Sequence, residues 1–136
     1  MSKLVVDTNV LLSSFISAGP PRIIVNRIRD RLDLLCLSSA ILEEYLTVLQ
    51  RAGISEHLLA SLFSLLHDPD HVLVVVPSRR VQVIRDDPSD DMFLECAIEA
   101  RADYVISGDR HLRRLRSFQG IEVIPPREYL SRLKAK

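Results

Sequence analysis

The sequence predicts an α/β domain with a mostly parallel central sheet of about five strands and helices on both faces. Short apolar runs alternate with segments of helical periodicity from one end of the chain to the other. Such alternation is typical of right-handed crossovers, in which each helix returns the chain to a parallel sheet. A length of 136 residues, 47% of them hydrophobic, suits one compact core. We therefore expect residues 1–136 to form a single domain.

The first part of the chain predicts two strands and two helices. Residues 3–6 form a short, largely apolar run that ends at Asp7, and a helical pattern follows at once. Pro20 and Pro21 break the chain and suit the first turn of a second helix. Residues 34–37 are apolar and predict a second buried strand.

The middle of the chain predicts two more helices and a strand. Ser38 or Ser39 can cap a helix whose apolar side chains repeat at three and four residues until about Gly53. Paired apolar residues predict a further helix over about residues 55–66. The run of residues 72–76 is rich in β-branched side chains and predicts the third strand.

The last third continues the alternation of helix and strand. Residues 86–91 form a turn rich in helix-starting side chains, and Phe93 belongs to the apolar face of the helix that follows. Residues 104–107 predict a fourth strand and residues 121–124 a fifth. A terminal helix is expected from residues 125–126 onward, which completes the alternation.

Composition narrows the class of protein. No run of about 18 or more apolar residues occurs, so we expect no membrane span and no signal peptide, and a cytoplasmic location. Cys36 and Cys96 lie within apolar patterns and are expected to be buried thiols in a reducing compartment. Basic and acidic residues balance at 18 each, so any attraction for nucleic acid must come from a local basic patch.

Four carboxylates occupy positions that a parallel sheet could gather. Asp7 and Asp109 follow predicted strands, whereas Glu44 and Asp90 lie on helices expected to pack against the sheet. Sites in such sheets form at the carboxyl ends of the strands, so all four side chains could converge there. Taken singly, each could instead cap a helix or face solvent. Gathered together, they would repel one another unless a cation lay between them, and oxygen ligands favour Mg²⁺ or Mn²⁺ over Zn²⁺.

Four segments, in order along nearly the whole chain, carry motifs of a known family. They are residues 5–11 (VVDTNVL), 38–45 (SSAILEEY), 87–91 (DPSDD) and 106–112 (ISGDRHL). On these motifs the chain resembles PIN domains, including the VapC-like toxins. The resemblance implies a PIN fold, a Mg²⁺ or Mn²⁺ site and an endoribonuclease that cleaves RNA. It also implies a toxin whose partner is an antitoxin protein.

The resemblance assigns roles to particular side chains. The residues expected to be both catalytic and metal-binding are Asp7, Glu44, Asp90 and Asp109. The residues expected to support them are Asn9, Ser107 and Asp91. Two choices of register stay open, Glu43 against Glu44 and Asp90 against Asp91. We favour Glu44 because it directly precedes the apolar Tyr45, and Asp90 because it stands three residues before Phe93.

Arginines follow the fourth acid directly. Arg110, Arg113 and Arg114 could form a basic rim that holds RNA phosphates, although a solvated helix face is the alternative. With seven aromatic residues and no Trp, base stacking on an aromatic platform is not expected. The apolar helices between residues 41 and 66 carry more leucines than one core face needs, which predicts a homodimer or an antitoxin docked there, although packing inside the monomer is the alternative.

Two rival functions are compatible with the same acids. One is a non-catalytic PIN-like binding module whose acidic pocket receives a basic peptide. The other is a metal-dependent nuclease or phosphatase that acts on DNA or on a small phosphate ester. A comparison of RNA, DNA and simple phosphodiesters as substrates would separate them.

Overall fold

The computed structural model describes residues 1–80 and 90–134. Helices and strands alternate broadly as expected, with two pairs of consecutive helices, α1–α2 and α3–α4. In chain order the elements are β1 (Ser2–Val6), α1 (Thr8–Ile16), α2 (Pro20–Arg29), β2 (Asp33–Leu37), α3 (Ser39–Arg51), α4 (Glu56–Leu66), β3 (Val72–Val74), α5 (Asp91–Ala100), β4 (Tyr104–Ile106), α6 (Arg110–Arg113), β5 (Ser117–Phe118), β6 (Ile121–Ile124) and α7 (Pro126–Lys134).

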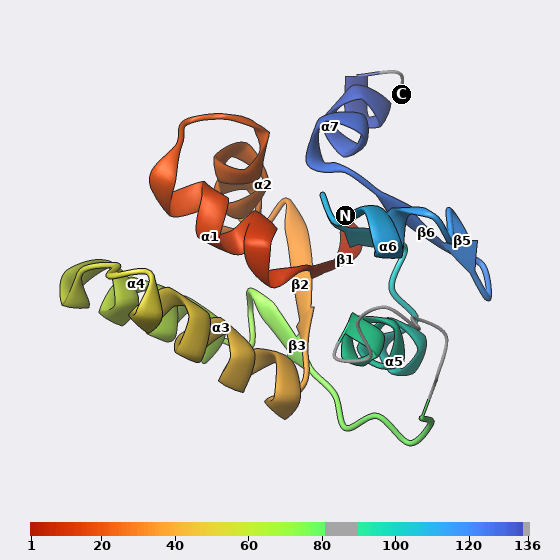
Figure 1. Ribbon diagram of the computed structural model, residues 1–136, viewed down its shortest axis with the longest axis horizontal. Helices are drawn as coiled ribbons and strands as arrows, with labels where there is room; N and C mark the ends of the chain where they lie inside the picture. The colour runs from red at the N-terminus through yellow and green to blue at the C-terminus, as the bar shows by residue number, and fades with distance from the viewer. Residues whose placement is uncertain (81–89, 135–136) are drawn as a thin grey trace.

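Within the described part of the chain, six strands form one sheet in the order β3-β2-β1-β4-β6-β5 (Figure 1). All neighbouring strands run parallel except β5, which pairs antiparallel with β6. The α/β class and the mostly parallel sheet are therefore confirmed. The sixth strand was not expected because β5 has only two residues, too few to show a hydrophobic period.

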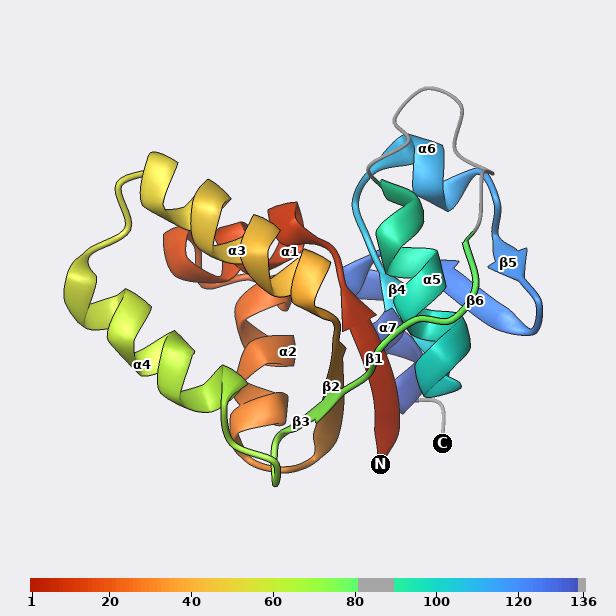
Figure 2. The same ribbon diagram turned by 90° about the horizontal axis from the view of Figure 1, so that it is seen from below.

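Helices flank both faces of the sheet. Figures 1 and 2 show α1, α2 and α7 on one face and α5 on the other, while α3 and α4 lie side by side next to β2 and β3. The central strand β1 is covered on both sides, so Leu4, Val5 and Val6 are at most 1% exposed. A parallel strand buried on both faces has an almost continuous apolar sequence, as this one does.

The strand expected over residues 72–76 is shorter in the structure, where β3 ends at Val74. Val75 still donates its backbone N–H to the Leu37 carbonyl at 2.8 Å, but the chain then leaves the sheet. Val74 and Val76 are 62% and 84% exposed. Since β3 is the edge strand, it has a neighbouring strand on one side only, and the apolar run predicted a longer strand than the pairing with β2 supports.

The buried carboxylate of Asp33 joins four segments at the end of the sheet where β2 begins. Asp33 is 1% exposed and accepts hydrogen bonds from Arg27 Nε at 2.8 Å and from the Tyr129 hydroxyl at 2.7 Å. The backbone N–H of Ser2 adds a longer one at 3.4 Å. This Asp33 cluster fastens α7 to α2, β1 and β2. Burial raises the pKa of Tyr129 to about 12, so its hydroxyl stays protonated at neutral pH.

Both cysteines are buried free thiols, as the sequence predicted. Burial raises the pKa of Cys36 to about 11 and that of Cys96 to about 12, so neither is a thiolate at neutral pH. None of the helices in the described ranges combines the length and the apolar character needed to cross a membrane.

Candidate active site

The register of the parallel strands brings three chain segments to one edge of the sheet. Val6 is opposite Ile106 and Ile106 is opposite Ile124, so β1, β4 and β6 end together. The backbone N–H of Asp7 donates to the Ile106 carbonyl at 3.0 Å, and that of Ser107 donates to the Ile124 carbonyl at 3.0 Å. Asp7 and Ser107 are therefore fixed as neighbours by main-chain hydrogen bonds.

Asp7 is a buried carboxylate that also begins a helix. Its Oδ1 accepts from the backbone N–H groups of Asn9, at 2.7 Å, and Val10, at 3.3 Å, which caps α1. Its Oδ2 accepts a short hydrogen bond from the Ser107 hydroxyl. Only 4% of the residue is exposed, and this burial raises the pKa of Asp7 above its ordinary value. The hydrogen bonds from Ser107, Asn9 and Val10 oppose that rise, while the nearby charge of Asp109 adds to it.

Asp109 repeats this arrangement at the start of α6. Its Oδ1 accepts from the backbone N–H groups of His111, at 2.7 Å, and Leu112, at 3.4 Å. Its own N–H donates to Ser107 Oγ at 2.9 Å. The fully buried Ser107 hydroxyl thus links the two acidic residues, donating to one and accepting from the other. The structure therefore places Asp7, Ser107 and Asp109 side by side.

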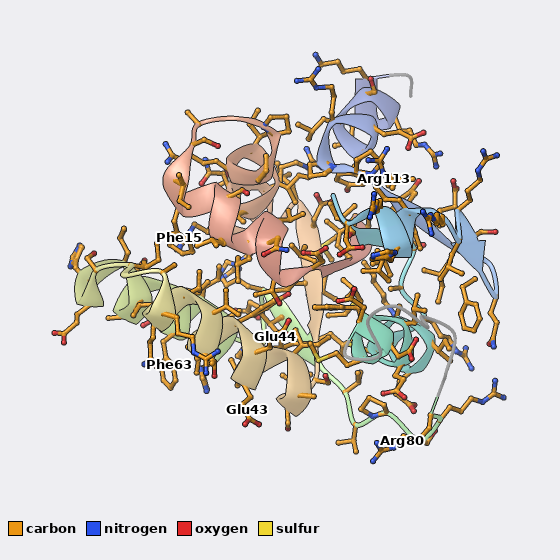
Figure 3. All side chains as sticks on the ribbon, viewed as in Figure 1. Phe15, Glu43, Glu44, Phe63, Arg80 and Arg113 are labelled. Atoms are coloured by element: carbon orange, nitrogen blue, oxygen red, sulfur yellow. The ribbon has the colours of Figure 1, made fainter. Side chains whose placement is uncertain are left out.

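Glu44 comes to the same region from α3. Its Oε2 accepts a hydrogen bond from the Thr8 hydroxyl, directly after Asp7 in the chain. Next along α3, the Tyr45 hydroxyl donates to the Val6 carbonyl at the end of β1, which fixes the rotation of the helix. Figure 3 shows Glu44 on the side of α3 that faces the centre of the molecule and Glu43 pointing away from it. Of the two glutamates, Glu44 is the one placed beside β1 and α1.

Thr8 is a site residue that the sequence interpretation did not single out. It stands inside the motif of residues 5–11, but a threonine after a strand also suits an ordinary helix start, so its role gave no signal of its own. Its hydroxyl orients a carboxylate that lies 36 positions away in the sequence. Only the packing of α3 against α1 reveals this contact.

Asp90 and Asp91 lie together at the amino end of α5, which packs against β1, β2 and β4. Asp90 is the capping residue and is half-buried, whereas Asp91 is in the first turn and only 6% exposed. Both acids thus lie on the helix that covers the face of the sheet opposite α1 (Figure 1). Residues 87–89, the rest of the third motif, lie outside the described residues.

The donor set fits a hard divalent cation in its chemistry, because every candidate ligand offers carboxylate oxygens. The proximity of Asp7 and Asp109 supports the same assignment, since a cation beside them would offset the effect of burial and like charge on Asp7. Within residues 1–80 and 90–134, however, no three acidic, histidine or cysteine side chains are grouped closely enough to hold a metal ion. Among the predicted acids, the structure brings together Asp7 and Asp109, which Ser107 joins.

The predicted basic rim begins one residue after Asp109. Arg110, Arg113 and Arg114 are all exposed on or just after α6 (Figure 3 labels Arg113). Arg113 also lines a hollow of about 410 Å³ together with Arg116. All three arginines follow Asp109 within five residues of the chain and are exposed to solvent.

Comparison with known proteins agrees with this arrangement. The PIN domain family model matches residues 3–111, a segment that runs from β1 into α6 and contains the first three motifs and all but the last residue of the fourth. The fold and the site therefore define an α/β domain of nuclease type, since PIN domains are generally nucleases and typically use divalent metals. The chain belongs to the PIN domain family. No curated protein matches it.

Proposed function

We propose that this PIN domain is a Mg²⁺- or Mn²⁺-dependent endoribonuclease that hydrolyses RNA phosphodiesters. The observation that carries the proposal is the pair of neighbouring acids, Asp7 and Asp109, joined through Ser107 at the carboxyl edge of the sheet. Exposed arginines of α6 lie directly beside this pair. Metal-dependent hydrolysis of a phosphodiester requires acidic side chains that bind the metal and, close to them, cationic side chains that bind phosphates.

Each part has a separate task in this mechanism. When bound, the metal polarises the scissile phosphate and makes the attacking water more acidic. Ser107 holds the Asp7 carboxylate in one orientation, and Thr8 does the same for Glu44. Arg110, Arg113 and Arg114 bind phosphates along the strand, and hydrolysis leaves 5′-phosphate and 3′-hydroxyl ends.

A cleavage assay tests the proposal. Purified protein should cut single-stranded RNA in Mg²⁺ or Mn²⁺, and Asp7→Asn and Asp109→Asn should each lower the rate at least about 100-fold. Both amides can still cap their helices, so the fold is retained. The matched control is Asp70→Asn, which alters an exposed ion pair with Arg31 far from the site and should cleave normally.

The outcome also separates the rival functions. If the protein cleaves DNA or a simple phosphodiester in preference to RNA, RNA is not its substrate and the metal-dependent nuclease or phosphatase is favoured. Metal binding measured by calorimetry without any cleavage would favour the binding module. Cleavage that survives in both Asp→Asn variants would place the catalytic centre elsewhere.

We also propose that the protein is the toxin of a cytoplasmic toxin–antitoxin pair and that it forms homodimers. Support comes from exposed apolar side chains on α4, where Leu58 is 41% and Phe63 is 48% exposed. Figure 3 shows Phe63 projecting from the outer side of the helix pair α3 and α4. Light scattering should give the mass of a dimer, and Phe63→Ser should lower it to that of one chain. Expression should arrest growth unless the neighbouring gene is co-expressed.

A further inference from the structure

A hollow of about 310 Å³ opens directly beside Asp109. Its lining includes Asn9, Val10, Ser13, Pro21 and Pro126 as well as Asp109 itself. We propose that this Asp109 hollow receives one unpaired nucleobase of the RNA, next to the scissile phosphate. This inference rests on the proposed function and adds to it a specificity subsite.

Four elements build the Asp109 hollow. Asn9, Val10 and Ser13 come from α1, Pro21 from the start of α2 and Pro126 from the start of α7, and the loop between β4 and α6 adds Gly108 and Asp109. The parallel register explains why they meet, since Ser107 pairs with Ile124 and the chain then runs into residues 125–126. The hollow therefore adjoins the edge of the sheet at which Asp7 and Asp109 lie.

The lining suits the two kinds of surface that a base presents. Val10 and the rings of Pro21 and Pro126 offer apolar surface to the flat faces of a base, and apolar atoms make up most of the lining. The amide of Asn9 and the hydroxyl of Ser13 can hydrogen-bond with its polar edge. None of the lining residues is aromatic, so proline rings here take the place of the usual aromatic platform.

Size and surroundings favour a single base over a longer ligand. The volume is at the lower end of the range of small-molecule pockets, roughly 300–1,000 Å³. On the other side of the β6–α7 junction, Pro125 lines the hollow that contains Arg113 and Arg116, together with Glu122 and Glu128, both of which are paired with Arg132. A strand with its base in the Asp109 hollow could pass its next phosphate towards these arginines.

Pro126 makes this subsite particular to the chain. The match to the PIN domain family ends at residue 111, whereas Pro126 lies beyond it. One wall of the Asp109 hollow thus comes from a segment that the family model does not cover. The base accepted beside the scissile phosphate should therefore depend on residues outside the matched region.

The test uses the full chain and short single-stranded RNA in which one nucleotide at a time is abasic. With wild-type protein, removal of one base beside the cleaved bond should raise KM about tenfold, while removal of distant bases should not. Ser13→Phe fills the hollow, so it should raise KM for intact RNA and abolish the difference between intact and abasic strands. The control Ser61→Phe adds the same ring at an exposed position of α4 that does not line the hollow. It should behave like wild type.

Fluorescence anisotropy in EDTA repeats the comparison without cleavage. If wild-type protein binds RNA but cuts none, and Ser13→Phe removes the penalty of the abasic nucleotide, the subsite stands and the proposed activity fails. If RNA is cut but no abasic position changes KM or affinity, the subsite is refuted and the activity stands. Absence of RNA binding refutes both. Pro126→Ala removes most of one proline ring from the lining and should reduce the difference between intact and abasic RNA. It replaces Ser13→Phe as the test if that variant does not fold.

Discussion

Replacement of Ser107 by alanine removes the hydroxyl that joins the two acids, and its effect should depend on pH. The Ser107 hydroxyl is fully buried and takes part in two hydrogen bonds. A bond to an ionised carboxylate contributes about 2 kcal/mol, and one from a backbone N–H about 0.5–1 kcal/mol. We therefore expect Ser107→Ala to lower the free energy of unfolding by about 2.5 kcal/mol at neutral pH.

The sign of the pH dependence follows from the pKa of Asp7. Burial raises this pKa and the Ser107 hydrogen bond lowers it, so the alanine variant should have a still higher pKa at Asp7. A carboxyl group whose pKa is higher in the folded than in the unfolded state weakens the fold when it ionises. The loss caused by Ser107→Ala should therefore be largest at neutral pH and shrink as pH falls through the raised pKa of Asp7.

Urea unfolding at about pH 7 and about pH 4 measures both effects, with a shift of about 1 M in the midpoint expected at the higher pH. The matched control is Ser14→Ala. Ser14 is also buried, but its hydroxyl donates to the Leu11 carbonyl at 2.5 Å and touches no carboxylate. It should lose about 1 kcal/mol at either pH. If Ser107→Ala lowers the free energy of unfolding equally at both pH values, the Ser107 hydrogen bond does not change the pKa of Asp7, and the reasoning is refuted.

Three further predictions test other parts of the molecule. Asp109→Asn should stabilise the metal-free protein at neutral pH, because it removes the charge that raises the pKa of Asp7 while the amide can still cap α6. Thermal unfolding in EDTA measures this effect, and an unchanged or lower Tm would contradict it. Tyr129→Phe should cost about 1–2 kcal/mol, because Asp33 loses a buried donor. Wild type should also lose stability between pH 10.0 and about 12, where unfolded Tyr129 ionises first, and the Phe variant should lose less, because Cys36 and Cys96 contribute equally in both proteins. Cys36 and Cys96 should resist alkylation at neutral pH until urea unfolds the chain, because their pKa values are about 11 and 12; rapid labelling of the native protein would refute their burial.

The sequence predicted the parts of the fold and site that depend on local pattern. A buried strand that ends in an acid placed Asp7 at the edge of the sheet, and the same logic placed Asp109. Apolar spacing on α3 favoured Glu44 over Glu43, in agreement with its position beside Thr8. What the pattern could not predict depends on contacts between distant segments. Such contacts include the link through Ser107 between residues about 100 positions apart, and the hollow that four elements share.

Short elements and ambiguous acids were the other limits. The two residues of β5 carry no period, and the apolar run after Val72 continues beyond the end of β3. Asp90 and Asp91 are adjacent in a helical turn, where spacing cannot decide which side chain points inward. The greater burial of Asp91 is a property of how α5 packs on the sheet.

The helix caps at Asp7 and Asp109 have a consequence for how such a domain can change over evolutionary time. Each acid needs only one of its oxygens to begin its helix, and an asparagine offers that oxygen equally well. A single nucleotide change from an aspartate to an asparagine codon would therefore remove a carboxylate and leave the start of the helix intact. Under the proposed mechanism, the domain lies one mutation from a folded copy of itself that lacks the activity.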